Sequence, residues 1–241
     1  MTAAAALSIV IPAYNEEARI ESTIRILQAD LPRDIGPWEI RVVDDGSLDG
    51  TMRVVQALAA EDPRVVLQQE PHRGKGGAVR AGLLAATGAL RFMCDADLSM
   101  PTHELPRFLA VVPSQCDIAI GTREGAGARR VGEPGHRHTM GRVFNWLVRS
   151  SGLAGGQDTQ CGFKMFTAEA VQAIFPWTRI EGWAMDIEVL YLAKLRGLRV
   201  QEIPIEWHYR ERSQVSPVTD SVRMARDLLR IRLNAIRGRY R

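Results

Sequence analysis

The sequence predicts an α/β protein built on a mostly parallel sheet with helices on its faces. Two observations support this class. Short apolar runs alternate with helical patterns through the first half of the chain, and three of these runs end in polar or glycine-rich loops. At 241 residues, of which 46% are hydrophobic, the chain is long enough to bury a full core as one large domain.

The elements of the first half follow the order β-α-β-α-β-α-β-α-β. Apolar runs predict strands at residues 7–12, 39–43, 65–69, 90–94 and 118–121. The segments between them predict helices at residues 16–28, 51–60, 78–86 and 103–112, the last with Thr102 as its N-cap. Ligands bind beyond the carboxyl ends of the strands in open sheets of this kind, so the loops there form the candidate site.

The second half of the chain has a different pattern. Residues 123–138 form a long loop rich in glycine and arginine, which is typical of a functional or mobile segment. Further helices are predicted at residues 141–150, 168–175 and 186–196, and a further strand at residues 200–205.

The last twenty residues or so predict a basic amphipathic helix. One stripe of this helix is apolar and consists of Val222, Ala225, Leu229, Leu233 and Ile236. A second stripe carries Arg223, Arg226, Arg230 and Arg237. Either the arginines meet the anionic headgroups of a membrane, or the helix packs on the domain with a solvated cationic face.

The composition argues against several classes of protein. The 31 lysines and arginines exceed the 28 acids by only three, and the C-terminal helix lacks interleaved aromatics, so no nucleic-acid partner is expected. Three cysteines without a C-x-x-C pair indicate neither a disulfide framework nor a zinc site. The first residues lack a basic leader, and no apolar stretch approaches the ~20 residues that span a bilayer. We expect a cytoplasmic protein, either soluble or peripheral on the cytoplasmic face of a membrane.

Asp95 and Asp97 follow the fourth predicted strand and are the most informative pair in the sequence. Residues i and i+2 of a strand face the same side, so the two carboxylates can converge where the strand ends. Oxygen ligands of this kind suit Mg²⁺ or Mn²⁺ and leave coordination positions for the oxygens of a diphosphate. A D-x-D spacing alone is as often a turn or a helix cap, so its place at the carboxyl edge decides the interpretation.

Two other loops reach the same edge. Tyr14 offers a ring for stacking on a nucleobase and Glu16 offers hydrogen bonds, although this loop could merely cap a helix. Asp45 ends the second strand, where a carboxylate can accept hydrogen bonds from a base or a ribose. A glycine-rich segment at residues 72–78 carries Lys75, but it is not a Walker A loop, and no G-x-G-x-x-G follows the first strand. A P-loop triphosphatase and a dinucleotide oxidoreductase are therefore disfavoured.

Five segments together resemble the family 2 glycosyltransferases of the GT-A fold. They are residues 8–16 (SIVIPAYNE), 42–47 (VVDDGS), 95–99 (DADLS), 121–123 (GTR) and 158–164 (DTQCGFK). Within that family the chain resembles the dolichyl-phosphate β-glucosyltransferases and related polyprenyl-phosphate glycosyltransferases, and the last segment favours the glucosyl branch over the mannosyl one. The resemblance implies a nucleotide-sugar half at about residues 1–122, an acceptor half at about 123–215 and a separate basic helix at 216–241.

The resemblance also implies roles for individual residues. A nucleotide-sugar donor would contact Pro12, Ala13, Tyr14, Glu16, Asp45, Lys75, Asp95, Ala96 and Asp97. Asp95 and Asp97 would hold Mg²⁺ or Mn²⁺ with the diphosphate. The residues expected to carry catalysis are Asp97, Arg123, Asp158 and Asp186. The phosphate of the acceptor would meet Arg123, Lys164 and Arg210, with Arg142 in reserve.

Some of these roles have a simpler alternative. Asp158 could position the sugar hydroxyls or the acceptor, or it could be a turn aspartate. Asp186 and Glu188 begin a predicted helix near Trp183, where acids also stabilise the helix dipole. The sequence departs from its relatives at Gln214, where they usually carry lysine.

A polyprenyl phosphate acceptor is already anionic, so it needs cations rather than a strong general base. The expected reaction is a single in-line displacement that inverts the sugar, so that UDP-glucose yields a β-linked polyprenyl phosphate glucose. Three alternatives stay open: a GDP-mannose donor, a soluble acceptor, and a nucleotide-sugar sensor without turnover.

Overall fold

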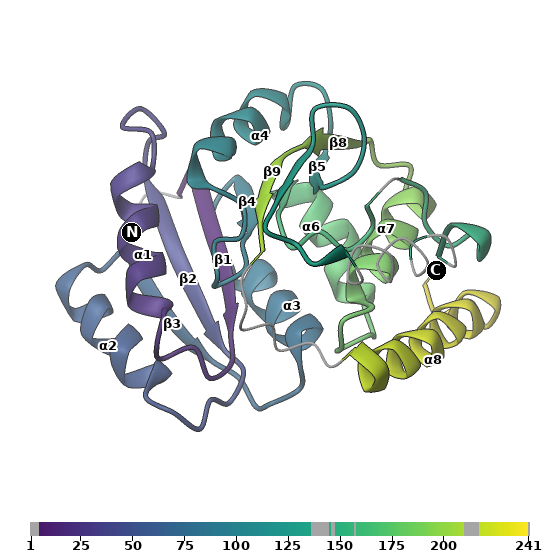
Figure 1. The fold of residues 1–241 in the computed structure, drawn as a ribbon, viewed down its shortest axis with the longest axis horizontal. Helices are drawn as coiled ribbons and strands as arrows, with labels where there is room; N and C mark the ends of the chain where they lie inside the picture. The colour runs from purple at the N-terminus through teal and green to yellow at the C-terminus, as the bar shows by residue number, and fades with distance from the viewer. Residues whose placement is uncertain (1–4, 136–144, 146–147, 157, 210–216, 241) are drawn as a thin grey trace.

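The computed structural model describes residues 5–135, 145, 148–156, 158–209 and 217–240. Within these residues the main sheet has seven strands in the order β3-β2-β1-β4-β7-β5-β8, with helices on both faces (Figure 1). A second sheet pairs β6 (Arg129–Val131) with β9 (Glu206–His208) in parallel. The prediction of an α/β protein with a mostly parallel sheet is confirmed.

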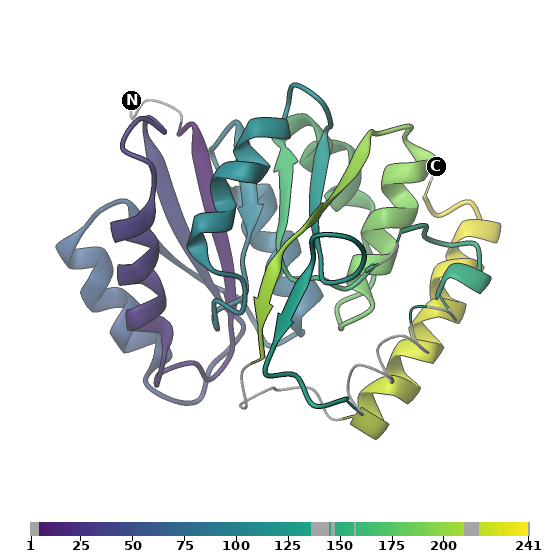
Figure 2. The same cartoon turned by 45° about the horizontal axis from the view of Figure 1, so that its top comes forward.

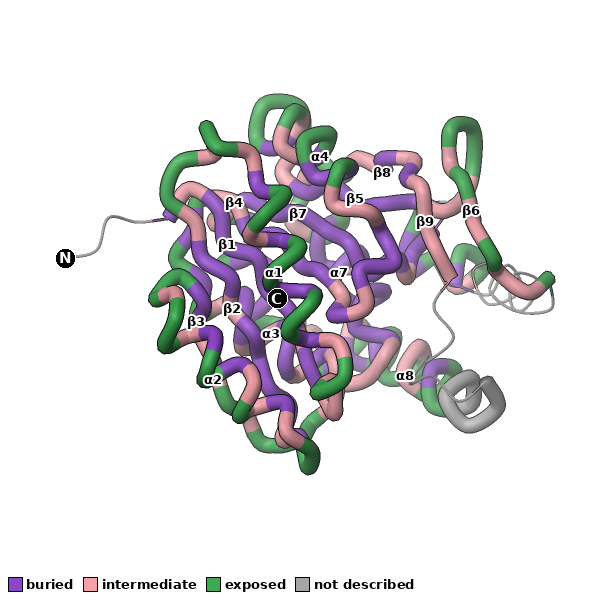
Figure 3. Tube along the Cα trace, turned by 60° about the vertical axis from the view of Figure 1, so that its left-hand side comes forward, coloured by how far each residue is buried: buried purple, intermediate pink, exposed green. Residues whose placement is uncertain are grey.

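The N-terminal half contains four of the predicted strands, all parallel: β1 (Leu7–Ala13), β2 (Trp38–Asp44), β3 (Val65–Gln69) and β4 (Leu90–Met93). Strand β1 pairs with β2 on one side and with β4 on the other. Its side chains are almost all buried, because a strand covered on both faces is apolar throughout rather than alternating (Figure 3). The helices that connect these strands are α1 (Ile20–Asp30), α2 (Thr51–Glu61) and α3 (Lys75–Ala85).

Two predicted helix starts are wrong. Helix α1 begins at Ile20 rather than at Glu16, because the chain first makes a turn in which the Arg19 and Ile20 amides donate to the Glu16 carbonyl. Helix α3 begins at Lys75, three residues before the predicted start. Its first turn contains Gly76, whose amide donates to the Glu181 carbonyl at 2.7 Å. The backbone at Glu181 thus approaches the first turn of α3 closely, which explains why a glycine stands inside this helix.

An antiparallel strand is the main difference from the predicted topology. Strand β7 (Lys164–Thr167) lies between β4 and β5 (Ile118–Thr122) and is antiparallel to both. Its first residue, Lys164, pairs with Met93 and Ile120 near the carboxyl ends of those strands. The segment before β7, from residue 158 to 163, therefore lies at the same edge as the loops that follow β1, β2 and β4.

The remaining elements complete the two layers of helices. A 3₁₀ turn η1 (Thr102–Glu104) leads into α4 (Leu105–Val111), and the predicted N-cap is wrong, since the Thr102 hydroxyl donates to Asp30 at the end of α1. Helices α6 (Ala168–Ile174) and α7 (Met185–Leu195) pack beside α3, and the 3₁₀ turn η2 (Phe175–Trp177) joins α6 to the following loop. Strand β8 (Val200–Pro204) confirms the last predicted strand, apart from its final residue.

The C-terminal helix is α8 (Pro217–Ile236), which lies along one flank of the molecule (Figure 2). Of the helix predicted at residues 141–150, residues 145 and 148–150 are helical and the rest lie outside the described part of the chain. Among the described residues, no helix has both the length and the apolar character needed to cross a bilayer.

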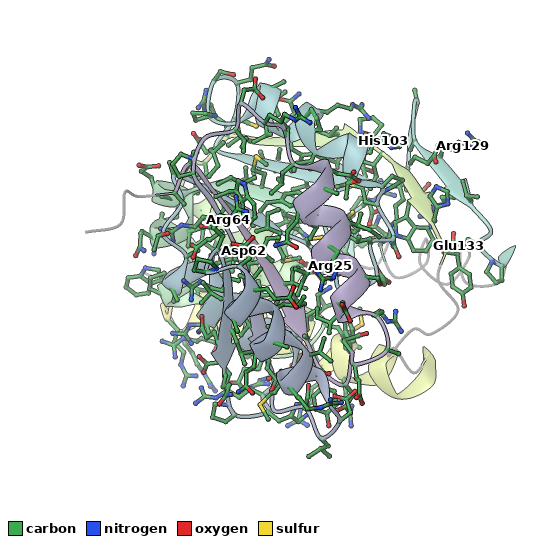
Figure 4. The ribbon with its side chains drawn as sticks, turned by 90° about the vertical axis from the view of Figure 1, so that its left-hand side faces the viewer. Arg25, Asp62, Arg64, His103, Arg129 and Glu133 are labelled. Carbon is green, nitrogen blue, oxygen red and sulfur yellow. The ribbon has the colours of Figure 1, made fainter. Side chains whose placement is uncertain are left out.

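Ion pairs on the surface contribute little to this fold. Arg25 of α1 pairs with Glu61 of α2 at 3.1 Å, and Arg64 pairs with Asp62 at 2.9 Å, on the α1–α2 side of the molecule (Figure 4). Both arginines are about half exposed, so water and salt screen these charges. The stability of the fold depends mainly on its apolar core.

Helix α3 packs unusually close to the sheet at Gly82. A Cβ atom at this position would lie 2.5 Å from the methyl groups of both Val10 and Val43, which are fully buried in β1 and β2. We expect Gly82→Ala to lower the free energy of unfolding in urea by about 1–3 kcal/mol, because a packed core resists added volume. Gly155→Ala is the control, since a Cβ there meets no atom within 4 Å. Equal losses in the two variants would contradict this packing.

Candidate active site

The carboxyl edge of the sheet gathers the loops that the sequence singled out. Asp95 and Asp97 follow β4, and the Asp95 carboxylate accepts a hydrogen bond from the Lys75 ammonium at 2.5 Å. Asp97 accepts one from the Ser99 amide at 2.9 Å. Burial and the neighbouring charge of Asp95 raise the pKa of Asp97 above its ordinary value. The two carboxylates thus lie close enough to repel each other.

This pair fits a divalent cation. Within the described residues there is no cluster of three or more histidine, cysteine or acidic side chains suited to a metal. The two carboxylates are the side-chain ligands that the sequence predicts. A hard cation bound by two carboxylates keeps positions for water and phosphate oxygens. The charge of the cation would also relieve the repulsion that raises the pKa of Asp97. Ala96 lies between Asp95 and Asp97 in the sequence, and its carbonyl accepts a hydrogen bond from the Thr23 hydroxyl of α1 at 2.6 Å.

The Asp95 carboxylate occupies the space that a side chain at Gly162 would fill. A Cβ atom on Gly162 would lie 1.8 Å from Asp95 Oδ2, so no larger residue can stand there while the carboxylate keeps its position. Gly162 belongs to the segment before β7, far from Asp95 in the sequence. The antiparallel strand therefore brings the 158–163 segment directly against the predicted metal ligand.

Lys75 is the cation that pairs with Asp95. Burial alone would lower its pKa, but the charges of Asp95 and Asp186 outweigh burial and raise it, so the side chain stays an ammonium. Its Nζ atom also lies 5.3 Å from the centre of the Trp183 ring. Lys75 thus connects the aspartates to the loop before α7.

Asp45 organises the loop that contains Lys75. Its two carboxylate oxygens accept the amides of Arg73 at 2.9 Å and Gly74 at 2.8 Å, and His72 Nδ1 lies 2.8 Å from Oδ2. The His72 ring stacks on the Tyr14 ring with centroids 4.3 Å apart. His72 is not among the predicted site residues, and only its place before Lys75 in the sequence could have indicated it. The role predicted for Asp45 towards a base or ribose stays a prediction.

The other predicted donor residues lie around the same loop. Pro12 and Ala13 end β1, and the Ala13 carbonyl accepts the Asp45 amide at 2.8 Å. Glu16 pairs with Arg19 at 2.7 Å. Burial raises the pKa of Glu16, and the negative charge of Asp97 raises it further.

Arg123 and Asp158 form a bidentate ion pair at the carboxyl edge of the sheet. Arg123 Nε donates to Asp158 Oδ2 at 2.6 Å and Nη2 donates to Oδ1 at 2.9 Å. Burial would raise the pKa of Asp158, but the charge and hydrogen bonds of Arg123 outweigh it and lower the pKa to about 2. At neutral pH Asp158 is thus a weak base whose evident effect is to orient Arg123. The guanidinium also lies 5.4 Å from the centre of the Trp207 ring.

Lys164 and Asp186 form a second pair inside the protein. Lys164 is fully buried, and its Nζ atom lies 2.6 Å from Asp186 Oδ1 and also donates to the Cys161 carbonyl. The pair links β7 to the first turn of α7. Because Lys164 is fully buried, a ligand phosphate can reach this ammonium only if the residues that cover it move. Arg142 and Arg210 lie outside the described residues.

Glu188 holds the loop that carries Trp183. Its Oε2 atom accepts the amides of Arg179 and Ile180, both at 2.8 Å, and its Oε1 atom accepts the Tyr240 hydroxyl at 2.5 Å. Burial raises the pKa of Glu188. The Tyr240 contact joins the end of the chain to this loop, and it was not visible in the sequence. Glu188 is therefore held as a positioning group rather than exposed to a ligand.

Gly162→Ala should weaken the binding of Mn²⁺ measured by calorimetry in the presence of UDP. The added methyl group must displace the Asp95 carboxylate, and loss of such support typically costs about 10–100-fold in metal affinity. Gly155→Ala serves as the control in open space. Unchanged Mn²⁺ affinity in Gly162→Ala would show that Asp95 is not a ligand.

Asp158→Asn tests the ion pair through the pH dependence of stability. Because the folded protein lowers the pKa of Asp158 from 3.8 to about 2, the pair stabilises the fold above about pH 4, and this contribution is lost as the pH falls towards 2. The variant should lose about 2 kcal/mol at pH 7 and progressively less as the pH falls from 4 to 2. Asp117→Asn, which breaks the exposed pair with Arg199, should have little effect. A loss independent of pH would contradict the assignment.

Comparisons with known proteins identify the family of this chain. Residues 8–175 match the sequence profile of glycosyl transferase family 2. The dolichyl-phosphate β-glucosyltransferase of Saccharomyces cerevisiae is 33% identical over 255 residues, which cover 98% of this chain and 76% of that protein. The corresponding protein of Homo sapiens is 34% identical over 251 residues, which cover 98% and 77%.

Solved structures give the fold. Glucosyl-3-phosphoglycerate synthase from Mycobacterium tuberculosis in complex with UDP has a TM-score of 0.69 at 20% identity, over 98% of this chain and 80% of that one. The same enzyme with Mn²⁺, UDP and glucosyl-3-phosphoglycerate has a TM-score of 0.70 at 19% identity, over 95% and 79%. The motifs, the fold and the relatives agree, and the chain belongs to glycosyl transferase family 2 as a nucleotide-sugar-dependent glycosyltransferase of the GT-A fold.

Proposed function

We propose that this glycosyltransferase moves glucose from UDP-glucose to a polyprenyl phosphate of the dolichyl type and forms a β-linked lipid phosphate sugar. One observation carries the proposal: relatives that match nearly the whole chain, from yeast to human, are dolichyl-phosphate β-glucosyltransferases. This similarity continues beyond residue 175, where the family profile ends, into the part of the chain that we assign to the acceptor.

We assign the donor to about residues 1–122. The stacked rings of Tyr14 and His72 offer a flat surface for the uracil, and Asp45 keeps the loop of His72 and Lys75 in place. The Lys75 ammonium, which is paired with Asp95, is the candidate cation for the diphosphate. Mg²⁺ or Mn²⁺ held by Asp95 and Asp97 would neutralise the charge on the departing UDP.

We assign the acceptor to about residues 123–215. Arg123 is the candidate cation for its phosphate, because Asp158 holds the guanidinium in one orientation. Lys164 could contribute only if the residues that bury its ammonium move. Arg142 and Arg210 are further candidates outside the described residues. The basic helix at 216–241 would make contact with the cytoplasmic face of a membrane.

The chemistry follows from the charge of the acceptor. An oxygen of the acceptor phosphate attacks the anomeric carbon while the bond from that carbon to UDP breaks, and the electron pair of this bond leaves with UDP. One displacement turns an α-linked donor into a β-linked product. The attacking oxygen is already anionic, so no strong base is needed. Asp158 and Asp186, each paired with a cation, serve to position their partners in this reaction.

A screen of nucleotide sugars and acceptors tests the proposal. Purified protein with Mg²⁺ or Mn²⁺ should transfer glucose from UDP-glucose to a short-chain polyprenyl phosphate, and nuclear magnetic resonance should show a β linkage. A clear preference for GDP-mannose would overturn the sugar assignment. Transfer to soluble phosphorylated acceptors alone would overturn the lipid acceptor.

Asp97→Asn should reduce metal-dependent transfer by at least about 10²-fold while the variant still melts cooperatively. The change removes one of two carboxylates that would bind the cation, but keeps nearly the same volume. Asp34→Asn, which alters an exposed acid between α1 and β2, is the matched control. Full activity of Asp97→Asn would exclude the proposed metal site.

A further inference from the structure

Helix α8 has two apolar faces, and the protein covers one of them. Met224 and Ile231 are buried against the domain, with 8% and 0% of their surfaces exposed. Leu229, Leu233 and Ile236 are 66%, 47% and 76% exposed. These three residues belong to the apolar stripe that the sequence predicts. The expected stripe thus points to solvent, and a different set of residues packs on the domain.

The geometry of a helix separates these faces. Successive residues are about 100° apart around the axis, so Ile231 lies about 160° from Leu229. Leu229, Leu233 and Ile236, spaced by four and three residues, form one narrow line along the opposite side. The exposed line therefore is a second face and not the edge of the buried one.

Arginines border the exposed line. Arg226, Arg230 and Arg237 are all exposed, and the helical repeat puts them on one side of the line of Leu229, Leu233 and Ile236. Arg230 has a partner on its own helix, Asp227 at 3.2 Å. A line of aliphatic side chains flanked by arginines is complementary to a surface that is anionic outside and apolar beneath.

The other face of α8 is fixed beside the acceptor side of the site. The Gln160 amide lies 4.0 Å from the sulfur of Met224, and a Cβ on Gly182 would lie 3.5 Å from the Asp227 carboxylate. Just beyond the helix, the Tyr240 hydroxyl bonds to Glu188. Gln160 follows Asp158 by two residues and Gly182 precedes Trp183. The helix is thus anchored to the two segments next to which we expect the acceptor.

We propose that α8 docks flat on an anionic lipid bilayer. Leu229, Leu233 and Ile236 enter the acyl region, and Arg226, Arg230 and Arg237 meet lipid phosphates. In this orientation the segments around Gln160 and Gly182 lie on the inner side of α8, about one helix diameter (~10 Å) from the bilayer, and the phosphate of a lipid acceptor would have to pass the helix to approach Arg123. The last step rests on the proposed function, whereas the docking itself does not.

Flotation with lipid vesicles tests the docking without donor or acceptor. The full chain should float with vesicles of phosphatidylcholine and phosphatidylglycerol, less with phosphatidylcholine alone, and less at high salt. The triple variant Leu229→Ser, Leu233→Ser, Ile236→Ser should bind anionic vesicles at least about tenfold more weakly, because it removes the apolar contact. The matched control is Ile26→Ser, Leu195→Ser, Val200→Ser, which changes three exposed aliphatic residues on other elements and should bind as the parent does.

Two results would overturn the docking: equal flotation of the triple variant and the parent, or a parent that is a dimer in solution and becomes a monomer in the triple variant. The second result would show that Leu229, Leu233 and Ile236 bind a second copy of the chain and not a bilayer. Transfer assays separate this inference from the proposed function. If the triple variant loses transfer to vesicle-embedded acceptor and keeps transfer to a short soluble one, docking and function both stand. If no lipid phosphate accepts sugar, flotation alone still decides the docking.

Discussion

The position of the Asp95 carboxylate is the constraint on which the rest of the site depends. It is held by the Lys75 ammonium at 2.5 Å on one side and lies against the Cα of Gly162 on the other. These residues come from the start of α3, the end of β4 and the segment before β7, so one carboxylate fixes three distant parts of the chain. Lys75 in turn depends on Gly76, whose close contact with the Glu181 carbonyl positions the loop of Trp183. A displacement at any of these points would move the candidate metal ligand.

The acids at this edge differ in what balances their charge, and that difference separates their roles. Asp158 is paired with Arg123, and Asp186 with Lys164. Glu188 is satisfied by two backbone amides and the Tyr240 hydroxyl. Among the described residues, the ammonium of Lys75 is the cation paired with Asp95, and no ion pair of Asp97 occurs. The excess negative charge of the two carboxylates would be balanced by a divalent cation. We therefore propose that the buried pairs position cations and loops, and that Asp95 and Asp97 serve the donor.

The sequence predicted those parts of the fold that have a strong local pattern. Strands β1 to β4 are apolar runs because both faces of a parallel sheet are covered, and the acids that follow them are visible as breaks in hydrophobicity. Strand β7 is four residues long and follows Cys161, Gly162 and Phe163, so no periodicity marked it. Its antiparallel position between β4 and β5 depends on contacts between distant parts of the chain. The stack of His72 on Tyr14 and the contact of Tyr240 with Glu188 join residues far apart in the chain, which no local pattern reveals. In α8 the helical spacing of the apolar residues predicted a stripe, but the sequence could not show which side of the helix packs on the domain.

We infer that Asp95 and Asp97 form an incomplete metal site that the diphosphate of the donor completes. Titration calorimetry with Mn²⁺, with and without saturating UDP, tests this most directly. We predict that UDP raises the affinity for Mn²⁺ by at least about tenfold, and that Mn²⁺ raises the affinity for UDP by the same factor, since the coupling of two ligands is reciprocal. Equal affinity for Mn²⁺ in the presence and absence of UDP would contradict the claim.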